Sequence, residues 1–449
     1  MKQIFSYNFN LKDIHDLDFE ALYKYRRRNS LFTCVFTHQK YIYAFRDHLG
    51  IAALYYRFIK GKWCFSSNPL DLITQNDTIN PLGLRYYLGL GTFKLHPIVK
   101  GLNIVPPGAV IKFQPGKSKP QKIYQYIINP TSLPSTVTTG YLVDRLEKIF
   151  IKAIERIIVT YQVGLFLSGG IDSGLIAIYL NKLGVKVNAY TSAPWGKLSS
   201  EIPFALTSAQ IAKVNRHYID TLDSTNYFTL FNQLFDLYSL PHANTSSLAI
   251  ANLFKHTPLK RETQVFIGQN CDNLTGSMPM QNWIFSLSFL PKFVKTMTKF
   301  KGQHWINDYI GLKTKGFVDH HPFFDRYYLP NKSLNRIQLL TLASQVVTNT
   351  QWASESFVQP LLTHNILPAN PYWDMDLIEW RLSLPYRYRF SFKPDSLTKL
   401  VLDKNLFQHL ASRYLPPDQA HRKKVFLSPK TIADKPKIFF TLFHQTLAA

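Results

Sequence analysis

The feature that most constrains the fold is a succession of four segments between residues 163 and 191. Val163 to Leu167 is a short apolar run typical of a buried strand, and the polar loop Ser168-Gly169-Gly170-Ile171-Asp172-Ser173 follows it. The apolar stretch from Ser173 to Leu183 predicts a helix, and Lys186 to Thr191 predicts a second strand. Strand, loop, helix and strand in this order predict a unit of α/β type.

The loop has the composition of a phosphate-binding turn. Its glycines let the backbone approach phosphate oxygens, and the start of the following helix offers partial positive charge to an anion. Ser168 and Ser173 add hydroxyl donors, whereas the Asp172 carboxylate would repel phosphate unless a divalent cation lay between them. We therefore predict Asp172 to be a magnesium ligand. The alternative is an Asp-Ser cap on an ordinary helix, with the glycines serving a tight turn.

No Gly-Lys-Ser/Thr follows the loop, which excludes the loop of enzymes that hydrolyse a γ-phosphate. A second strand-to-loop transition occurs where Gln264 to Ile267 runs into Gly268. Together with the first unit, it predicts an α/β domain in the second half of the chain.

The 449 residues suit two domains. The first part has short β-rich segments separated by turns, which predicts a region of mostly sheet. The stretch from Asn129 to Thr139 is rich in Pro, Ser and Thr, as in a linker, and Tyr141 to Thr160 has the apolar spacing of an amphipathic helix. We predict domains at 1–128 and 141–449 joined by a linker at 129–140. The β-rich segments are Leu31 to Thr37, Lys40 to Phe45, Ile51 to Arg57, Lys62 to Phe65 and Ala109 to Phe113.

Composition and charge indicate the cellular compartment and the kind of partner. Three widely separated cysteines, Cys34, Cys64 and Cys271, form neither a disulfide framework nor a metal motif, and neither an export signal nor an apolar run of membrane-spanning length is visible. We expect a cytoplasmic protein. The formal charge of +24 favours an anionic partner, but the basic residues form no recognisable nucleic-acid module. We therefore expect no nucleic-acid partner and leave peripheral membrane contact open.

Five further blocks make nearly the whole chain resemble the asparagine synthetase family. The resemblance implies an α+β N-terminal domain, a degenerate Ntn-hydrolase-like sheet sandwich of the glutamine-amidotransferase type. An α/β PP-loop ATP-pyrophosphatase domain with a helical C-terminal part would follow it. The blocks are Phe45 to Ile51, Gly101 to Gly108, Gly268 to Asn273, Pro371-Tyr372-Trp373-Asp374, and Leu415-Pro416-Pro417 with His421 to Phe426.

By this resemblance, Asp272 is the second carboxylate on Mg²⁺, and Lys423 stabilises negative charge on the acyl-adenylate, with Lys424 as the close alternative. Asp172, Asp272 and Lys423 are then the predicted catalytic residues. Gln269 replaces an expected glutamate and cannot act as a general base. The predicted ATP-binding residues are Leu167, Ser168, Gly169, Gly170, Asp172, Ser173, Thr191 and Gly268.

Glutamine-dependent members of the family expose a cysteine where this chain has Lys2. We therefore expect the N-terminal domain to lack glutaminase activity and the amine to come from elsewhere. Among family members without that cysteine, the chain most resembles lasso peptide cyclases.

This likeness implies that ATP adenylates an Asp or Glu side chain of a precursor peptide and that the peptide's N-terminal amine closes an isopeptide ring. A leader-binding protein and a leader peptidase are the expected partners. The alternatives are a β-lactam or small-molecule amide synthetase, an ammonia-dependent asparagine synthetase-like enzyme, and a non-catalytic peptide-binding module.

Overall fold

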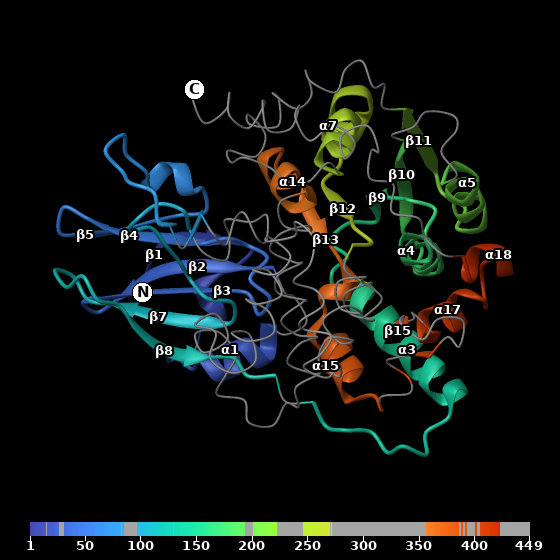
Figure 1. The fold of residues 1–449 in the computed structure, drawn as a ribbon, viewed down its shortest axis with the longest axis horizontal. Helices are drawn as coiled ribbons and strands as arrows, with labels where there is room; N and C mark the ends of the chain where they lie inside the picture. Colours follow the sequence, from blue (N-terminus) through green and yellow to red (C-terminus); the bar gives the residue numbers. More distant parts are fainter. Residues whose placement is uncertain are drawn as a thin grey trace, which may run out of the picture.

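A computed structural model gives the fold (Figure 1). It describes residues 1–14, 16–26, 31–81, 83–84, 97–128, 130–193, 201–221, 246–269, 271, 356–385, 388, 391–392, 400–401 and 405–422. Every structural statement below concerns these residues. Predicted sites at Asp272, Lys423 and Lys424 lie outside them, as does most of the expected helical C-terminal part.

The N-terminal region consists of antiparallel sheets. One has the strand order β1-β2-β3-β7-β8, and the other has the order β5-β4-β6. Val35 of β2, Ala44 of β3 and the β7 residues Ile111 and Phe113 pack with Leu54 and with Tyr56 of β4, so the two sheets share a small apolar core. The bounds are β1 Lys2–Tyr7, β2 Thr33–His38, β3 Tyr41–Arg46, β4 Tyr55–Ile59, β5 Lys62–Ser66, β6 Asn103–Ile104, β7 Ala109–Phe113 and β8 Gln121–Gln125.

The predicted strand from Ile51 to Arg57 begins too early. Strand β4 starts only at Tyr55, because the backbone N–H groups of Ile51 and Ala52 are bonded to the buried Asp47 carboxylate, each at 2.9 Å. Backbone groups committed to a side chain cannot join a sheet ladder. Burial raises the pKa of Asp47 to about 6.

The block that contains Asp47 is tied to the block that ends at Gly108. The Arg46 guanidinium donates to the carbonyl oxygens of Val105, at 2.9 Å, and of Gly50, while the Gly108 N–H donates to the Asp47 carbonyl oxygen at 2.8 Å. The two N-terminal blocks are therefore one buried polar turn, which explains why they stand out together in the sequence.

The second half contains a five-stranded sheet in which every neighbouring pair is parallel, in the order β11-β10-β9-β12-β13. Helices α4 and α5 lie on one face and α7 on the other (Figure 1), as right-handed crossovers require. The bounds are β9 Gln162–Phe166, α4 Ile171–Lys182, β10 Lys186–Ala193, α5 Ile202–Ile211, β11 Arg216–Thr221, α7 Ser246–His256, β12 Gln264–Phe266 and β13 Leu367–Ala369.

These bounds confirm the parallel α/β domain and the strand-loop-helix-strand unit at its start. A buried carboxylate connects two parts of the sheet. Glu262 accepts hydrogen bonds from Asn188 Nδ2 at 2.9 Å and from the Tyr190 hydroxyl at 2.6 Å. Because all three groups are buried and mutually bonded, they fix β10 relative to the segment that enters β12.

The remaining helices pack around this sheet. Helix α3 begins at Thr139, capped by the Thr138 side chain, and ends at Glu155, five residues before the predicted end. Helix α17 packs against α3 and α4. The other elements are α1 Phe19–Arg26, α14 Gln359–Thr363, α15 Met375–Ser383, α17 Asn405–Ala411, α18 Pro417–Ala420, the short strands β14 Ser391–Phe392 and β15 Leu400–Val401, and the 3₁₀ turns Leu11–Asp13, Pro69–Leu72, Pro258–Arg261 and Pro371–Trp373.

The two regions contact each other directly. The Tyr126 hydroxyl donates to Glu379 Oε1 of α15 at 2.8 Å, and the Leu133 N–H donates to the Ser383 carbonyl oxygen at 2.9 Å. Among the described helices, none is long and apolar enough to cross a bilayer.

Candidate active site

The parallel sheet places the predicted phosphate loop at a topological switch point. After β9 the chain moves to β10 on one side, and later it returns to β12 on the other side of β9. Ligands of open parallel sheets bind in the crevice outside the carboxyl ends of the strands at such a point. The loop that starts at Ser168 follows β9 and Gly268 closely follows β12, so both predicted phosphate-binding segments lie at the carboxyl ends of neighbouring strands.

Serine hydroxyls fix the shape of the loop. The backbone N–H of Ser168 donates to Ser173 Oγ at 3.1 Å, and the Ser173 hydroxyl donates to the Gly170 carbonyl oxygen at 3.4 Å. The Oγ atoms of Ser168 and Ser173 are 3.3 Å apart. Ser168 is exposed and Ser173 is buried, so Ser173 braces the loop while Ser168 is available to a ligand.

Two glycines are required by close packing. Gly169 has a φ of +72°, and a Cβ built on it would lie 2.5 Å from the carbonyl oxygen of Glu201. A Cβ on Gly268 would lie 3.0 Å from the backbone nitrogen of Ser173, in the first turn of α4. The close approach of Gly268 to Ser173 places the first residue of the block after β12 directly beside the phosphate loop.

Asp172 lies in the first turn of α4 and is 6% exposed. The Tyr372 hydroxyl donates to its backbone oxygen at 3.0 Å. A carboxylate is the type of hard oxygen donor that Mg²⁺ prefers, and a phosphate at this helix end would need a cation between itself and Asp172. Asp172 therefore fits a magnesium-bridged phosphate. The described residues contain no cluster of three or more metal-ligating side chains, and Asp272 lies outside them.

Thr191 and Leu167, both predicted to bind ATP, contact each other. The Thr191 hydroxyl donates to the Leu167 carbonyl oxygen at 2.5 Å and lies 2.8 Å from Nε2 of His217. Burial lowers the pKa of His217, which favours its neutral form. The side chain of Leu167 is 1% exposed and packs in the core, so its backbone is the part nearest the loop.

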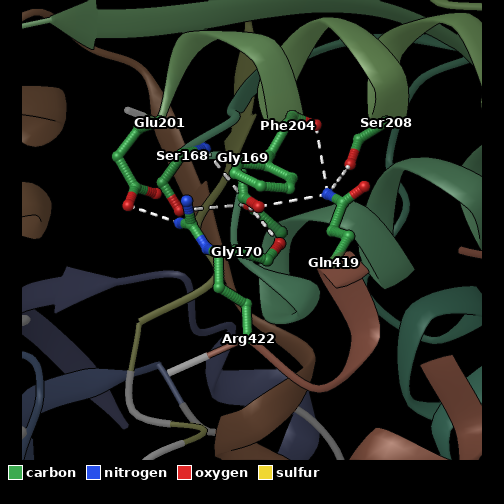
Figure 2. A network of polar contacts seen from close by, with 9 residues as sticks. Ser168, Gly169, Gly170, Glu201, Phe204, Ser208, Gln419 and Arg422 are labelled. Atoms are coloured by element: carbon green, nitrogen blue, oxygen red, sulfur yellow. Dashed lines mark hydrogen bonds and ion pairs between the residues drawn. The ribbon is translucent and has the colours of Figure 1, made fainter. Parts of the chain in front are cut away.

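Sequence reasoning missed a set of contacts between the C-terminal part and the loop. Figure 2 shows Gln419 of α18 bonded to the carbonyl oxygen of Gly169 at 3.1 Å, and Arg422 bonded to Glu201 at the start of α5. The resemblance had marked this terminal segment for Lys423, which lies outside the described residues. Gln419 and Arg422 carried no pattern that could single them out, because their partners are more than 200 positions away.

The block Pro371 to Asp374 has a structural role in this chain. The Asp374 carboxylate caps α15 by accepting the N–H groups of Asp376, at 2.9 Å, and Leu377, at 3.2 Å, and pairs with Arg156 at 3.0 Å. Burial raises the pKa of Asp374 to about 6. Tyr372 is the residue of the block that reaches the phosphate loop, and the sequence did not indicate this role.

Gln269, which replaces the expected glutamate, is held in place through its backbone. Its carbonyl oxygen accepts a hydrogen bond from Asn370 Nδ2, just after β13, at 2.8 Å. In the N-terminal region, Lys2 pairs with Thr37 in the antiparallel sheet. Cys34 is buried in β2, and burial raises the pKa of its thiol to about 12, which disfavours the thiolate form that a nucleophile needs.

A parallel α/β sheet with a glycine-rich phosphate loop at its switch point defines a nucleotide-binding domain of the PP-loop type. A family model described as Asparagine synthase matches residues 145–447, about two thirds of the sequence. The chain therefore belongs to the asparagine synthase family. Its second half is an asparagine synthase-like, ATP-dependent, amide-forming domain of a family that uses ATP and Mg²⁺.

Two further comparisons complete this result. No curated protein matches the chain. Among solved structures, it is similar to the NH3-dependent NAD synthetase from Campylobacter jejuni subsp. jejuni NCTC 11168 in complex with the nitrate ion, with 14% identity and a TM-score of 0.24. That match covers 48% of this chain and 95% of the other.

Proposed function

We propose that this protein is a macrolactam synthetase of the lasso cyclase type. It adenylates an Asp or Glu side chain of a precursor peptide and joins the resulting acyl group to the N-terminal amine of the same peptide. The observation that carries the ATP-dependent step is the loop at the carboxyl end of β9, where the exposed Ser168 and the buried Asp172 lie beside the N-terminus of α4.

The reaction balances in two steps. A carboxylate oxygen of the peptide attacks the α-phosphorus of ATP, and pyrophosphate leaves. The N-terminal amine then attacks the acyl carbon, AMP leaves, and the amine gives up a proton, so the peptide loses one water overall. When bound, Mg²⁺ would neutralise charge on the polyphosphate, and Asp172 and Asp272 are the residues proposed to hold it.

The protein's own groups have separate tasks in this proposal. Ser168 and the N–H groups at the start of α4 bind the phosphates, and Ser173 keeps the loop in shape. Lys423 stabilises the negative charge that develops at the acyl carbon. Thr191 and Gly268 border the nucleotide from the neighbouring strand ends.

Two observations support an amine supplied by the substrate itself. The Cys34 thiol is buried and its pKa is raised, so it is poorly suited to release ammonia from glutamine. Gln269 replaces the acidic residue of the family pattern, which favours an amine held close to the acyl group by the substrate. Because that amine must be free, a leader peptidase has to act before ring closure. A leader-binding protein that delivers the precursor completes the proposed set of partners.

The test is to incubate the purified protein with ATP, Mg²⁺ and leader-free precursor peptide. We expect AMP and pyrophosphate together with a peptide that has lost one water and resists exopeptidase. Asp172→Ala should abolish all three products. Asp144→Ala, which changes an exposed carboxylate on α3, is the matched control and should retain activity. Formation of ADP would refute the adenylation chemistry, and asparagine made from aspartate and ammonia would refute the peptide substrate.

A further inference from the structure

Gln419 uses its whole donor capacity on the phosphate loop and the helix beside it. The side chain is 2% exposed, and its Nε2 lies 3.1 Å from the Gly169 carbonyl oxygen, 3.1 Å from the Phe204 carbonyl oxygen and 2.8 Å from Ser208 Oγ (Figure 2). A side-chain amide has only two N–H bonds, so three acceptors leave no donor for any other partner.

The bond to Gly169 sets the orientation of one peptide plane. The peptides of the described residues are all trans, and in a trans peptide the carbonyl and the N–H point in opposite directions. Holding the Gly169 oxygen toward Gln419 therefore turns the Gly170 N–H to the opposite side. Gly170 is the N-cap of α4, so its N–H joins those of the first helical turn, which form the predicted phosphate site.

This plane is one that needs an external restraint. It lies between two glycines, Gly169 at a φ of +72° and Gly170 at −79°, and glycine has access to many backbone conformations. A flip of the plane would replace an N–H by a carbonyl oxygen on the side that faces phosphate. Gln419 selects the orientation that presents the donor.

Gln419 is poorly suited to a purely stabilising role. Its Oε1 is buried and has no hydrogen-bond partner in the described part of the chain. A buried unsatisfied acceptor lowers stability, so Gln419 adds less to stability than its three acceptors alone would suggest. The presence of glutamine is explained if the donor it supplies to Gly169 serves binding.

Arg422 secures the segment that carries Gln419. Its guanidinium pairs with the Glu201 carboxylate and lies 4.0 Å from the centroid of the Phe204 ring. The backbone oxygens of Glu201 and Phe204 are the same groups that approach Gly169 and Gln419. Arg422 and Gln419 therefore contact the N-terminal part of α5 from the same side (Figure 2).

We propose that Gln419 is a positioning residue for pyrophosphate binding: it locks the Gly169–Gly170 peptide with the Gly170 N–H toward the phosphates, and Arg422 holds Gln419 in place through Glu201. This inference rests on the proposed binding of ATP at the loop. It adds to that function a second layer of residues, from the far end of the chain, that set the affinity for the pyrophosphate part of the nucleotide.

The experiment measures the binding of Mg·ATP and of AMP by titration calorimetry. In Gln419→Met, the Kd for Mg·ATP should rise about tenfold, which corresponds to about 1.4 kcal/mol. The Kd for AMP, which lacks the pyrophosphate, should stay unchanged, and the thermal midpoint should fall, because the Gly169 oxygen and Ser208 Oγ lose a buried donor. Glu201→Gln, which weakens the pair with Arg422 from the α5 side, should raise the Kd for Mg·ATP by a smaller factor and leave the Kd for AMP unchanged.

Arg413→Ala is the matched control, because Arg413 also belongs to the C-terminal segment and pairs with Glu147 and Asp144 of α3, away from the loop. It should lower the thermal midpoint and leave both affinities unchanged. Wild-type affinity for Mg·ATP in Gln419→Met, or an equal loss for ATP and AMP, would overturn the positioning role while leaving the proposed function standing. A wild-type protein that does not bind Mg·ATP would overturn both.

Discussion

Gly169→Ala tests whether the phosphate loop depends on close packing against α5. Gly169 has a φ of +72°, and it packs directly against the Glu201 carbonyl oxygen. The alanine Cβ would lie 2.5 Å from that oxygen and 3.0 Å from the backbone nitrogen of Ala205. Both distances are well inside ordinary contact, which is about 3.5–4.0 Å between heavy atoms. Because both neighbours are backbone atoms of a helix start, side-chain rotation cannot relieve the contact.

Two costs add in this substitution. A non-glycine residue in the left-handed region costs about 1–2 kcal/mol, and forcing a methyl group into a packed site costs about 1–3 kcal/mol more. The expected loss of about 2–5 kcal/mol is a large part of the 5–15 kcal/mol that typically separates folded from unfolded protein. The Kd for Mg·ATP should rise as well, because a shift of α5 away from Gly169 disturbs the loop.

The assay is urea unfolding, with Gly184→Ala as the control. Gly184 has nearly the same backbone angle, a φ of +75°, but a Cβ there would meet nothing within 4 Å. The control should lose only the conformational part, about 1–2 kcal/mol, and keep its affinity for Mg·ATP. Equal losses of stability in Gly169→Ala and Gly184→Ala would show that packing against α5 contributes nothing and would refute the reasoning.

Three further predictions follow from other contacts of the site. Gly268→Ala would place a Cβ 3.0 Å from the Ser173 nitrogen, so α4 must move by a few tenths of an ångström. We expect a stability loss of about 1–3 kcal/mol in urea unfolding and weaker binding of Mg·ATP. Unchanged binding would contradict the close approach of Gly268 to Ser173. Since burial lowers the pKa of His217, the unfolded chain takes up a proton first as the pH falls below the ordinary value of 6.5. The free energy of unfolding should therefore fall in that range, and by less in His217→Phe, whereas parallel pH profiles would count against a buried neutral imidazole. Asp374→Ala should lower the stability by at least about 1 kcal/mol through loss of the α15 cap, and by more through loss of the Arg156 pair. Asp374→Asn keeps the cap and should lower the stability by less. Equal thermal midpoints for the two variants would argue against capping.

The central α/β unit could be predicted because its elements depend on local sequence. Apolar runs after Gln162 and Lys186 are buried on both faces of a parallel sheet, and the Ser-Gly-Gly turn between the first run and the apolar helix marks the end of the strand. Their observed ends lie within two residues of the predicted ones. The N-terminal strand Lys2–Tyr7 was not predicted, because this short stretch has no clear alternation of apolar and polar residues and owes its strand form to pairing with β2.

The errors and omissions arise where distant segments meet. The early start predicted for β4 fails because Asp47 takes the N–H groups of Ile51 and Ala52, and no propensity scale contains that contact. The contacts of Tyr372 and Gln419 with the loop were not predicted for the same reason, since the groups they bind are 200 and 250 positions away. A sequence pattern reports which residues a loop contains, whereas only the fold reports what holds the loop.

This division between a loop and its supports has a functional consequence. The motif at Ser168 supplies the groups that contact phosphate, but its shape depends on the packing of Gly268 from β12, the Tyr372 hydroxyl after β13 and the Gln419 amide of α18. Each support comes from a segment that enters the site late in the sequence, and α18 directly precedes the proposed transition-state lysine. Gln419 and Arg422 therefore connect the loop to the stretch of sequence that leads to Lys423. Binding of ATP and placement of the lysine should accordingly be coupled, with α18 as the physical link between them.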